Sequence, residues 1–142
     1  MNRAVSYPEP QSLDGPAIAF LAERHLATLS VVRPDGRVHV SPVGFTFDPE
    51  SGLAWVITSA TARKSMHAAT AGRVSLCQVD GGRWLTLEGP VRIADDAESV
   101  AEAEAHYAAR YQAPRPNPTR VALVVAVDRI YGRVPNPDSA EV

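Results

Sequence analysis

Residues 73–94 read RVSLCQVDGGRWLTLEGPVRIA, and this stretch decides the fold. Two runs rich in strand-forming residues, 73–80 and 83–94, are separated only by Gly81 and Gly82. Two glycines between such runs predict a tight β-hairpin, because glycine accepts the positive φ angles that two-residue turns require. The stretch therefore predicts two long antiparallel strands near the middle of the chain.

Strand patterns continue on both sides of this hairpin. Three precede it, at 26–33, 37–48 and 53–59, with the turn sequences RPDG and DPESG between them. A nearly continuous apolar run at 120–132 predicts a last strand that is buried on both faces. Within 37–48, Pro42 and Gly44 predict a bulge or an opening at a sheet edge, because proline cannot donate to a ladder.

Helix patterns occupy three of the intervals between strands. Asp14 is a plausible N-cap for a first short helix, and 62–71 predicts a second. Asp95 or Asp96 caps a longer third helix, which carries an apolar stripe at helical spacing. The stripe consists of Val100, Tyr107, Ala108 and Tyr111. Six antiparallel strands with three helices predict a mainly β fold, and a sheet of this size tends to close into a barrel.

The length of 142 residues suits one domain, which we place at 13–134. Residues 1–12 carry two prolines and little apolar content, so we expect a flexible N-terminal arm there, and residues 135–142 form a C-terminal tail. The net charge of −2 argues against a nucleic-acid or membrane-surface partner. No signal-peptide core or membrane-length apolar run is present, so we expect a cytoplasmic protein.

Conventional catalytic motifs are missing from the sequence. There is no nucleophile elbow, no phosphate-binding P-loop, no H-E-x-x-H helix and no dinucleotide fingerprint. The four histidines lack ligand-like spacing, so no metal site is assigned, and Cys77 fits a packed thiol in a strand. We therefore expect any chemistry to belong to a bound cofactor, and we assign no catalytic residue.

One short segment favours an anion site. Lys64 is the single lysine among 14 basic Lys and Arg residues, and it follows Arg63 at the start of the second predicted helix. The loop before it carries Thr58, Ser59 and Thr61. Hydroxyl groups, two cations and the amides of a helix N-terminus together suit a phosphate. A solvated basic pair at the start of a helix is the alternative interpretation.

Several segments carry a family resemblance. They are FLAERHLATL, HVSPVGFTFDP, VITSATARKS, QVDGGRWLTLEG, AEAHYAARYQAPRPNPTRV and VDRIYG, which together span about residues 17–132. The chain resembles the split β-barrel flavin- and deazaflavin-binding proteins related to pyridoxamine 5'-phosphate oxidase. Within them it looks most like the actinobacterial group that uses coenzyme F420, especially the F420-dependent biliverdin reductases. The resemblance implies a six-stranded antiparallel split β-barrel of the FMN-binding type.

The resemblance also implies a homodimer with a cofactor groove between the two barrels. Lys64 matches the family lysine at the coenzyme phosphate, and Arg63 beside it suits an acidic cofactor tail. His67 stands where many relatives have Asn, which alters one expected contact. The other positions that match the cofactor site are Thr58, Ser59, Thr61, His39, Val40, Ser41, Pro42, Val43, Gln78, Val79, Trp84 and Arg129.

Other roles remain open for several of these residues. Trp84 could instead plug one end of the barrel, and His39 and Ser41 could face solvent from an edge strand. Arg115 and Arg120 flank a proline-stiffened loop and could pair with substrate carboxylates, although surface charge is the alternative.

Three functions follow for testing. The first is a reductase that transfers a hydride from reduced F420 to a conjugated small-molecule acceptor, biliverdin being reduced to bilirubin. The second is a related oxidase or reductase that uses FMN, which carries a phosphate on a similar chain. The third is a module that binds a flavin-type cofactor or a tetrapyrrole without turnover. Arg63 beside Lys64 favours F420 over FMN, because the F420 tail is acidic.

Overall fold

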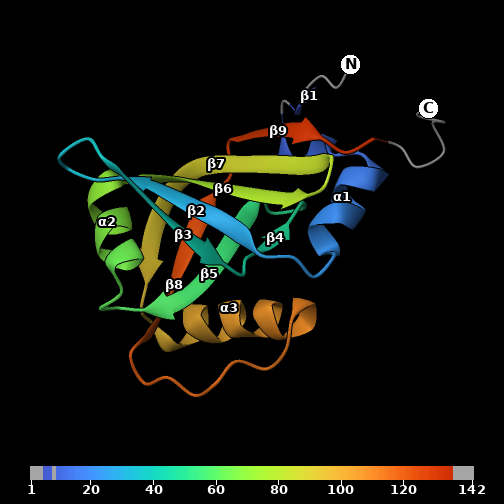
Figure 1. Ribbon diagram of the computed structural model, residues 1–142. Helices are drawn as coiled ribbons and strands as arrows, with labels where there is room; N and C mark the ends of the chain where they lie inside the picture. The colour runs from blue at the N-terminus through green and yellow to red at the C-terminus, as the bar shows by residue number, and fades with distance from the viewer. Residues whose placement is uncertain (1–4, 8, 136–142) are drawn as a thin grey trace.

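The computed structural model describes residues 5–7 and 9–135 (Figure 1). Nine strands occur in this part of the chain, all paired antiparallel, with three α-helices and a 3-10 turn at Pro10–Ser12. The mainly β prediction is confirmed. The strands are β1 (Val5–Tyr7), β2 (Ala27–Val32), β3 (Val38–Val43), β4 (Thr46–Asp48), β5 (Leu53–Ser59), β6 (Arg73–Asp80), β7 (Arg83–Ala94), β8 (Arg120–Ala126) and β9 (Arg129–Arg133). The helices are α1 (Gly15–Ala22), α2 (Arg63–Ala71) and α3 (Ala97–Arg110).

The central hairpin forms as predicted. β6 and β7 pair from Arg73 opposite Pro90 to Asp80 opposite Arg83, and Gly81 takes a φ of 62° in the turn. The main ladder runs β3-β2-β6-β7-β8-β5-β4, and β9 pairs with both β7 and β1. Among the described strands this ladder does not close into a ring, so the sheet is strongly curved but open between β3 and β4.

The predicted last strand is two strands. β8 pairs with the second half of β7, whereas β9 pairs with the first half of the same strand. The chain bends between them at Asp128, whose amide donates to the Glu88 carbonyl at 2.9 Å. Apolar periodicity does not mark such a bend, because buried residues flank it on both sides. β8 is buried on both faces, as predicted, while β9 alternates.

The predicted strand at 37–48 also divides, here into β3 and β4. The break falls at Gly44 and Phe45, next to the expected irregularity. Pro42 stays within β3, which is an edge of the main ladder, so its missing N–H is tolerated. β1 is a correction to the predicted flexible arm, because Val5–Tyr7 pairs with β9. Residues 1–4, 8 and 136–142 of the predicted arm and tail lie outside the described residues.

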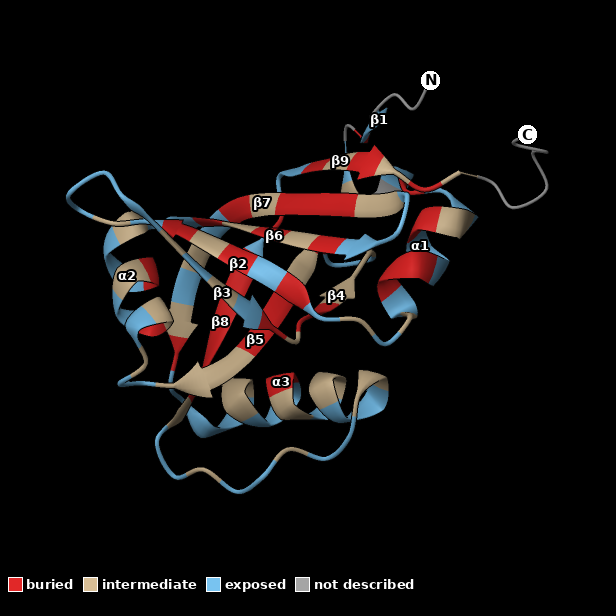
Figure 2. Cartoon of the chain, in the orientation of Figure 1, coloured by how far each residue is buried: buried red, intermediate tan, exposed pale blue. Residues whose placement is uncertain are grey.

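Helix starts follow their predicted caps. Asp14 accepts a hydrogen bond from the Ala17 amide at 2.9 Å, and Asp96 accepts one from the Ser99 amide at 3.0 Å. Of the two candidates for α3, Asp96 is therefore the cap. The core fills the inside of the curved sheet, with the buried segments of the strands in red in Figure 2. Ala103 of α3 packs on Trp55 and Ala122, and the predicted stripe is wrong at Ala108, which is exposed.

Candidate functional site

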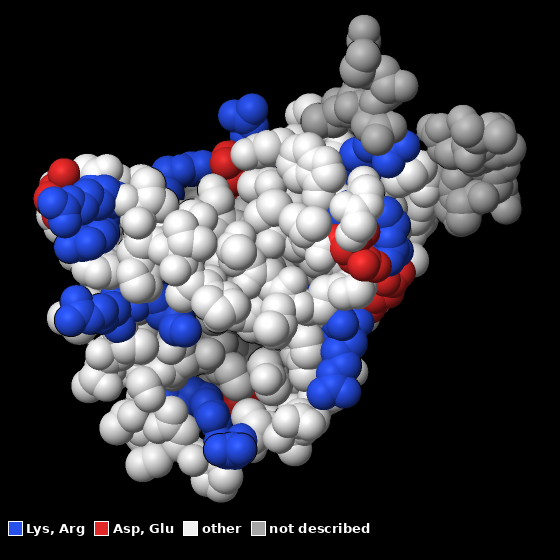
Figure 3. Space-filling view, viewed as in Figure 1, with Lys and Arg blue, Asp and Glu red and all other residues white. Residues whose placement is uncertain are grey.

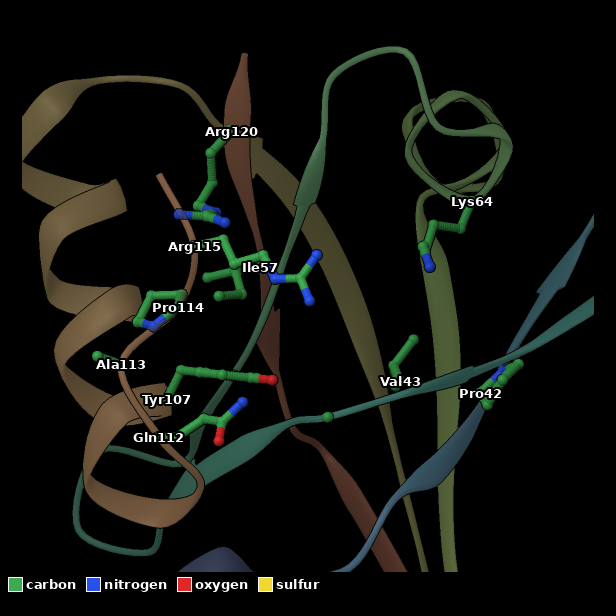
Figure 4. Close-up of a pocket in the computed structure, with 11 residues that line it drawn as sticks. Pro42, Val43, Ile57, Lys64, Tyr107, Gln112, Ala113, Pro114, Arg115 and Arg120 are labelled. Atoms are coloured by element: carbon green, nitrogen blue, oxygen red, sulfur yellow. The ribbon is translucent and has the colours of Figure 1, made fainter. Parts of the chain in front are cut away.

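A cavity of about 370 Å³ opens between the end of β3, the start of α2 and the segment that follows α3 (Figure 4). One part of its wall is apolar, and the other part carries amide, hydroxyl and cationic groups. Its lining consists of Pro42, Val43, Gly44, Ile57, Lys64, Tyr107, Gln112, Ala113, Pro114, Arg115 and Arg120. Five of these were predicted as cofactor or substrate residues: Pro42, Val43, Lys64, Arg115 and Arg120. The fold thus gathers predicted residues that lie up to 78 positions apart.

Lys64 lies in the first turn of α2 and extends its amino group into the cavity (Figure 4). Ser65 ties this turn to β5, because its hydroxyl donates to the Ser59 carbonyl at 2.8 Å. No described residue forms an ion pair or hydrogen bond with the Lys64 amino group. A half-buried cation held by an anchored helix, and without a protein partner, suits an incoming anion.

The two arginines of the cavity differ in their partners. Arg120 donates to Glu104 of α3 at 2.7 Å, and its side chain is only 10% exposed, so its charge is balanced within the protein. Arg115 is exposed and has no ion-pair partner among the described residues. Its guanidinium and the Lys64 amino group point into the same space from opposite sides (Figure 4). Basic side chains border a hollow on the corresponding face in Figure 3.

The apolar wall comes from β3 and β5. Pro42 and Val43 end β3, and Ile57 contributes from β5. The backbone breaks at Gly44, where an added Cβ would lie 3.1 Å from Cε2 of Tyr107 and 3.2 Å from Cε2 of Tyr111. A larger residue at this position would crowd both rings, and they would have to move slightly away from the strand end. The result is an apolar surface beside two unpaired cations.

A hydrogen-bonded anchor fixes this corner of the molecule. The Tyr111 hydroxyl donates to the His25 carbonyl at 2.7 Å and accepts from the Phe45 amide at 3.2 Å. The Arg110 guanidinium donates to the carbonyls of Glu23 and Phe45 and to Oε1 of Gln78. Burial lowers the Arg110 pKa and raises the Tyr111 pKa. This anchor holds the end of α3, and with it the residues that line the cavity.

Several predicted cofactor residues lie away from the cavity. Gln78 is a correction, because it is fully buried and its amide donates to the Phe20 carbonyl at 2.8 Å. The Ser59 hydroxyl accepts from the Asn117 amide at 3.0 Å, so Ser59 ties the proline-rich loop to β5. The remaining residues of the predicted set that do not line the cavity are Thr58, Thr61, Arg63, His67, His39, Val40, Ser41, Val79, Trp84 and Arg129.

Some of these residues form groups of their own. His39 of β3 and His67 of α2 are in ring contact, with centroids 5.2 Å apart. Val79 and Trp84 are cross-strand neighbours beside the central turn, and Trp84 meets Tyr131 edge to face. Trp84 therefore packs against β9 within this chain.

One cluster of side chains has the residue types of a metal site. The ligand atoms of Glu23, His25 and Asp80 lie within 4.8 Å of one another, a grouping that histidine spacing alone does not predict. Arg83 donates to both carboxylates, however, and its hydrogen bonds lower the Glu23 pKa to about 2, with His25 adding to the effect. The guanidinium thus already occupies the position that a cation would need.

Sequence reasoning missed part of the wall. Ile57, Gln112 and the loop residues Ala113 and Pro114 carried no functional signal, and Tyr107 was assigned to an apolar stripe. The polar end of a tyrosine in such a stripe is the one hint that was available. None of the helices in the described part of the chain has the length and apolar character that a membrane span requires.

Comparison with known proteins agrees with this fold. The family model for pyridoxamine 5'-phosphate oxidase matches residues 15–133, and the chain belongs to this family. The chain is also 48% identical over 120 residues to a biliverdin reductase of Mycobacterium tuberculosis that depends on reduced F420. That match covers 84% of this chain and 88% of the mycobacterial protein.

Solved structures share the architecture. An F420 reductase superposes with a TM-score of 0.65 at 22% identity, covering 79% of this chain and 93% of its own. General Stress Protein 26 of Bacillus anthracis superposes with a TM-score of 0.66 at 18% identity, covering 82% and 91%. At these identities the likeness establishes the fold alone.

Proposed function

We propose that this protein is a reductase that uses reduced coenzyme F420 to reduce biliverdin to bilirubin. The observation that carries the proposal is the cavity in which Lys64 and Arg115 face an apolar strand end, neither of them paired with a described residue. The 48% identity to the mycobacterial biliverdin reductase supports the choice of cofactor and acceptor.

The residues present fit this cofactor. Lys64 would hold its phosphate by a charge-assisted hydrogen bond. Pro42, Val43 and Ile57 would pack against a flat, apolar ring system. When bound, reduced F420 supplies the hydride, and the chain supplies binding, orientation and exclusion of water. Arg115 is available for a carboxylate of the acceptor or of the cofactor tail, whereas Arg120 is already paired.

A homodimer in the cytoplasm is part of the same proposal. The neighbouring strands β2 and β3 carry three exposed valines. The exposed fractions are 56% for Val32, 57% for Val38 and 55% for Val40. A second copy would cover this apolar face, and it would also bring Val79, Trp84 and Arg129 of one protomer near the cavity of the other. Light scattering should give twice the 15.2 kDa chain mass, and a monomer would contradict this part of the proposal.

The test is a fluorescence titration of the purified protein with F420 and, separately, with FMN. We expect F420 to bind more tightly. Lys64→Ala should weaken F420 binding by about 1.5–3 kcal/mol, because a hydrogen bond to a charged group is lost. Arg37→Ala is the matched control, since the Arg37 side chain is 78% exposed and does not line the cavity.

Three results would count against the proposal. FMN binding without F420 binding would replace the cofactor. Equal losses in the two variants would show that Lys64 makes no specific contact. Binding of biliverdin without turnover by reduced F420 would indicate a binding module instead of an enzyme.

A further inference from the structure

Tyr107 lines the cavity and carries a hydroxyl group, and the proposed function gives this hydroxyl no role. Its ring lies on α3, and its hydroxyl points into the cavity beside the Gln112 amide (Figure 4). No described residue forms a hydrogen bond with this hydroxyl. The hydroxyl groups of Tyr111 and Tyr131, by contrast, donate to the His25 carbonyl at 2.7 Å and to Glu88 at 3.0 Å. A half-buried phenol that lines a cavity without a protein partner is available to a ligand.

The position of Tyr107 is fixed by its surroundings. Its ring packs on that of Tyr111, with centroids 4.9 Å apart and the planes inclined at 36°. Both rings rest on Gly44, where even one added carbon would lie 3.1 Å from Tyr107. Tyr111 is in turn held by the backbone of Phe45 and His25. The hydroxyl is therefore preorganised, as a group that acts on a reacting ligand needs to be.

Reduction of a conjugated acceptor requires a proton as well as a hydride. Lys64 is committed to an anion in the proposed function, and the Gln112 amide has no proton to transfer at ordinary pH. Arginine also stays protonated in proteins. Tyr107 is then the group lining the cavity that can both give up a proton and recover it from water.

We infer that Tyr107 donates this proton to the acceptor, an inference that rests on the proposed function. The acceptor carbon gains the hydride and its two electrons from the reduced coenzyme, which is oxidised. The electron pair displaced through the conjugated system reaches a ring nitrogen or oxygen of the acceptor. The O–H bond of Tyr107 breaks as a new bond to hydrogen forms at that atom, and water then returns a proton to the phenolate. Arg115, which lines the same cavity, offsets the transient negative charge.

The test is Tyr107→Phe, which keeps the ring on Gly44 and removes only the hydroxyl. In single-turnover mixing of biliverdin with the protein and reduced F420, the reduction rate should fall about 100-fold or more, as for loss of a general acid. The solvent deuterium isotope effect on that step should also change. F420 affinity should remain that of the wild type. Tyr131→Phe is the matched control, because the Tyr131 hydroxyl is bonded to Glu88 and does not line the cavity, and its rate should be unchanged.

A second measurement does not depend on turnover. The visible absorption band of biliverdin, titrated with protein in the absence of cofactor, should shift differently with wild type and with Tyr107→Phe, since one hydrogen bond to the pigment is lost. A variant that reduces biliverdin within twofold of the wild-type rate and gives the same band shift would overturn the inference and leave the proposed function intact. Failure of the wild type to reduce biliverdin would instead overturn the proposed function, and this inference with it.

Discussion

Arg110 is a half-buried cation that forms no ion pair with a carboxylate in the described part of the chain. Its nitrogen atoms donate to two backbone carbonyls and one side-chain amide, and its guanidinium stacks over the rings of Phe45 and Tyr111. The acceptors come from three separate parts of the chain. The hydrogen bonds of this side chain therefore connect α3 to the end of α1 and to the break after β3.

Arg110→Met should lower the free energy of unfolding by about 2–4 kcal/mol, because methionine fills similar space but cannot donate to the acceptors on Glu23, Phe45 and Gln78. Urea denaturation would measure the change. Arg37→Met serves as the control, since the Arg37 side chain is 78% exposed and should shift stability by no more than about 0.5 kcal/mol. Similar losses in both variants would contradict the role assigned to Arg110.

At the scale of elements, β7 connects two parts of the sheet, because its two halves pair with different strands. It pairs with β9 up to Glu88 and with β8 from Val91 onward. The chain changes partner at Gly89, where an added Cβ would lie 2.0 Å from the Ala126 carbonyl oxygen. This close approach of two backbones is possible only without a side chain.

Gly89→Ala should therefore destabilise the protein by about 2–3 kcal/mol, because backbone segments must move apart. Gly15→Ala is the control for the loss of glycine itself. Gly15 begins α1 and an added Cβ there would meet nothing within 4 Å, so this change should be neutral or slightly stabilising. Thermal unfolding of both variants would check the pair, and an unaltered melting temperature for Gly89→Ala would rule out the steric account.

The two places where predicted strands divide show which parts of the fold could be predicted from the sequence. Periodicity and turn residues located the strand regions other than β1 and both capped helix starts, because these signals are local. The breaks after β3 and after β8 depend on residues that arrive from elsewhere, namely Tyr111 at Phe45 and Glu88 at Asp128. The sequence does not show that Tyr111 contacts Phe45 or that Glu88 contacts Asp128. Two of the six predicted strand runs were therefore not recognised as pairs of shorter strands.

The candidate site divides in the same way. Lys64 lines the cavity, and its place between a strand and a helix singled it out in the sequence as a candidate for binding an anion, which stays a prediction. Tyr107 and Gln112 were not predictable, since they come into the cavity only when α3 packs across the open end of the sheet. The prediction that Gln78 lines the cofactor cleft was wrong. The sequence does not indicate whether a polar side chain on a strand faces a cleft or bonds to a buried backbone carbonyl, as Gln78 does to that of Phe20.

At the scale of the whole molecule, stability should depend on acid through Glu23. Hydrogen bonds from Arg83 and then His25 lower its pKa from 4.5 to about 2 in the folded protein. A carboxyl with a depressed folded pKa contributes stability above its unfolded pKa and loses it as pH falls toward the folded value. The loss should therefore occur between about pH 4.5 and pH 2.

Unfolding free energies measured across this window should fall less steeply for Glu23→Gln than for the wild type. The difference should stay below about 1 kcal/mol, because the Glu23 side chain is 41% exposed and solvent screens the pair. Glu102→Gln, on an exposed part of α3, should keep the wild-type slope. Parallel curves for Glu23→Gln and the wild type would refute the assignment.

The pairing of β1 with β9 joins the two extremes of the described chain, with Val5 opposite Gly132. Among the described strands β1 is synthesised before all the others and β9 after them, so β1 lacks this partner until the strands between them have been made. Contacts this distant in sequence form slowly and late. Completion of this edge of the sheet is accordingly a step that follows translation of β9.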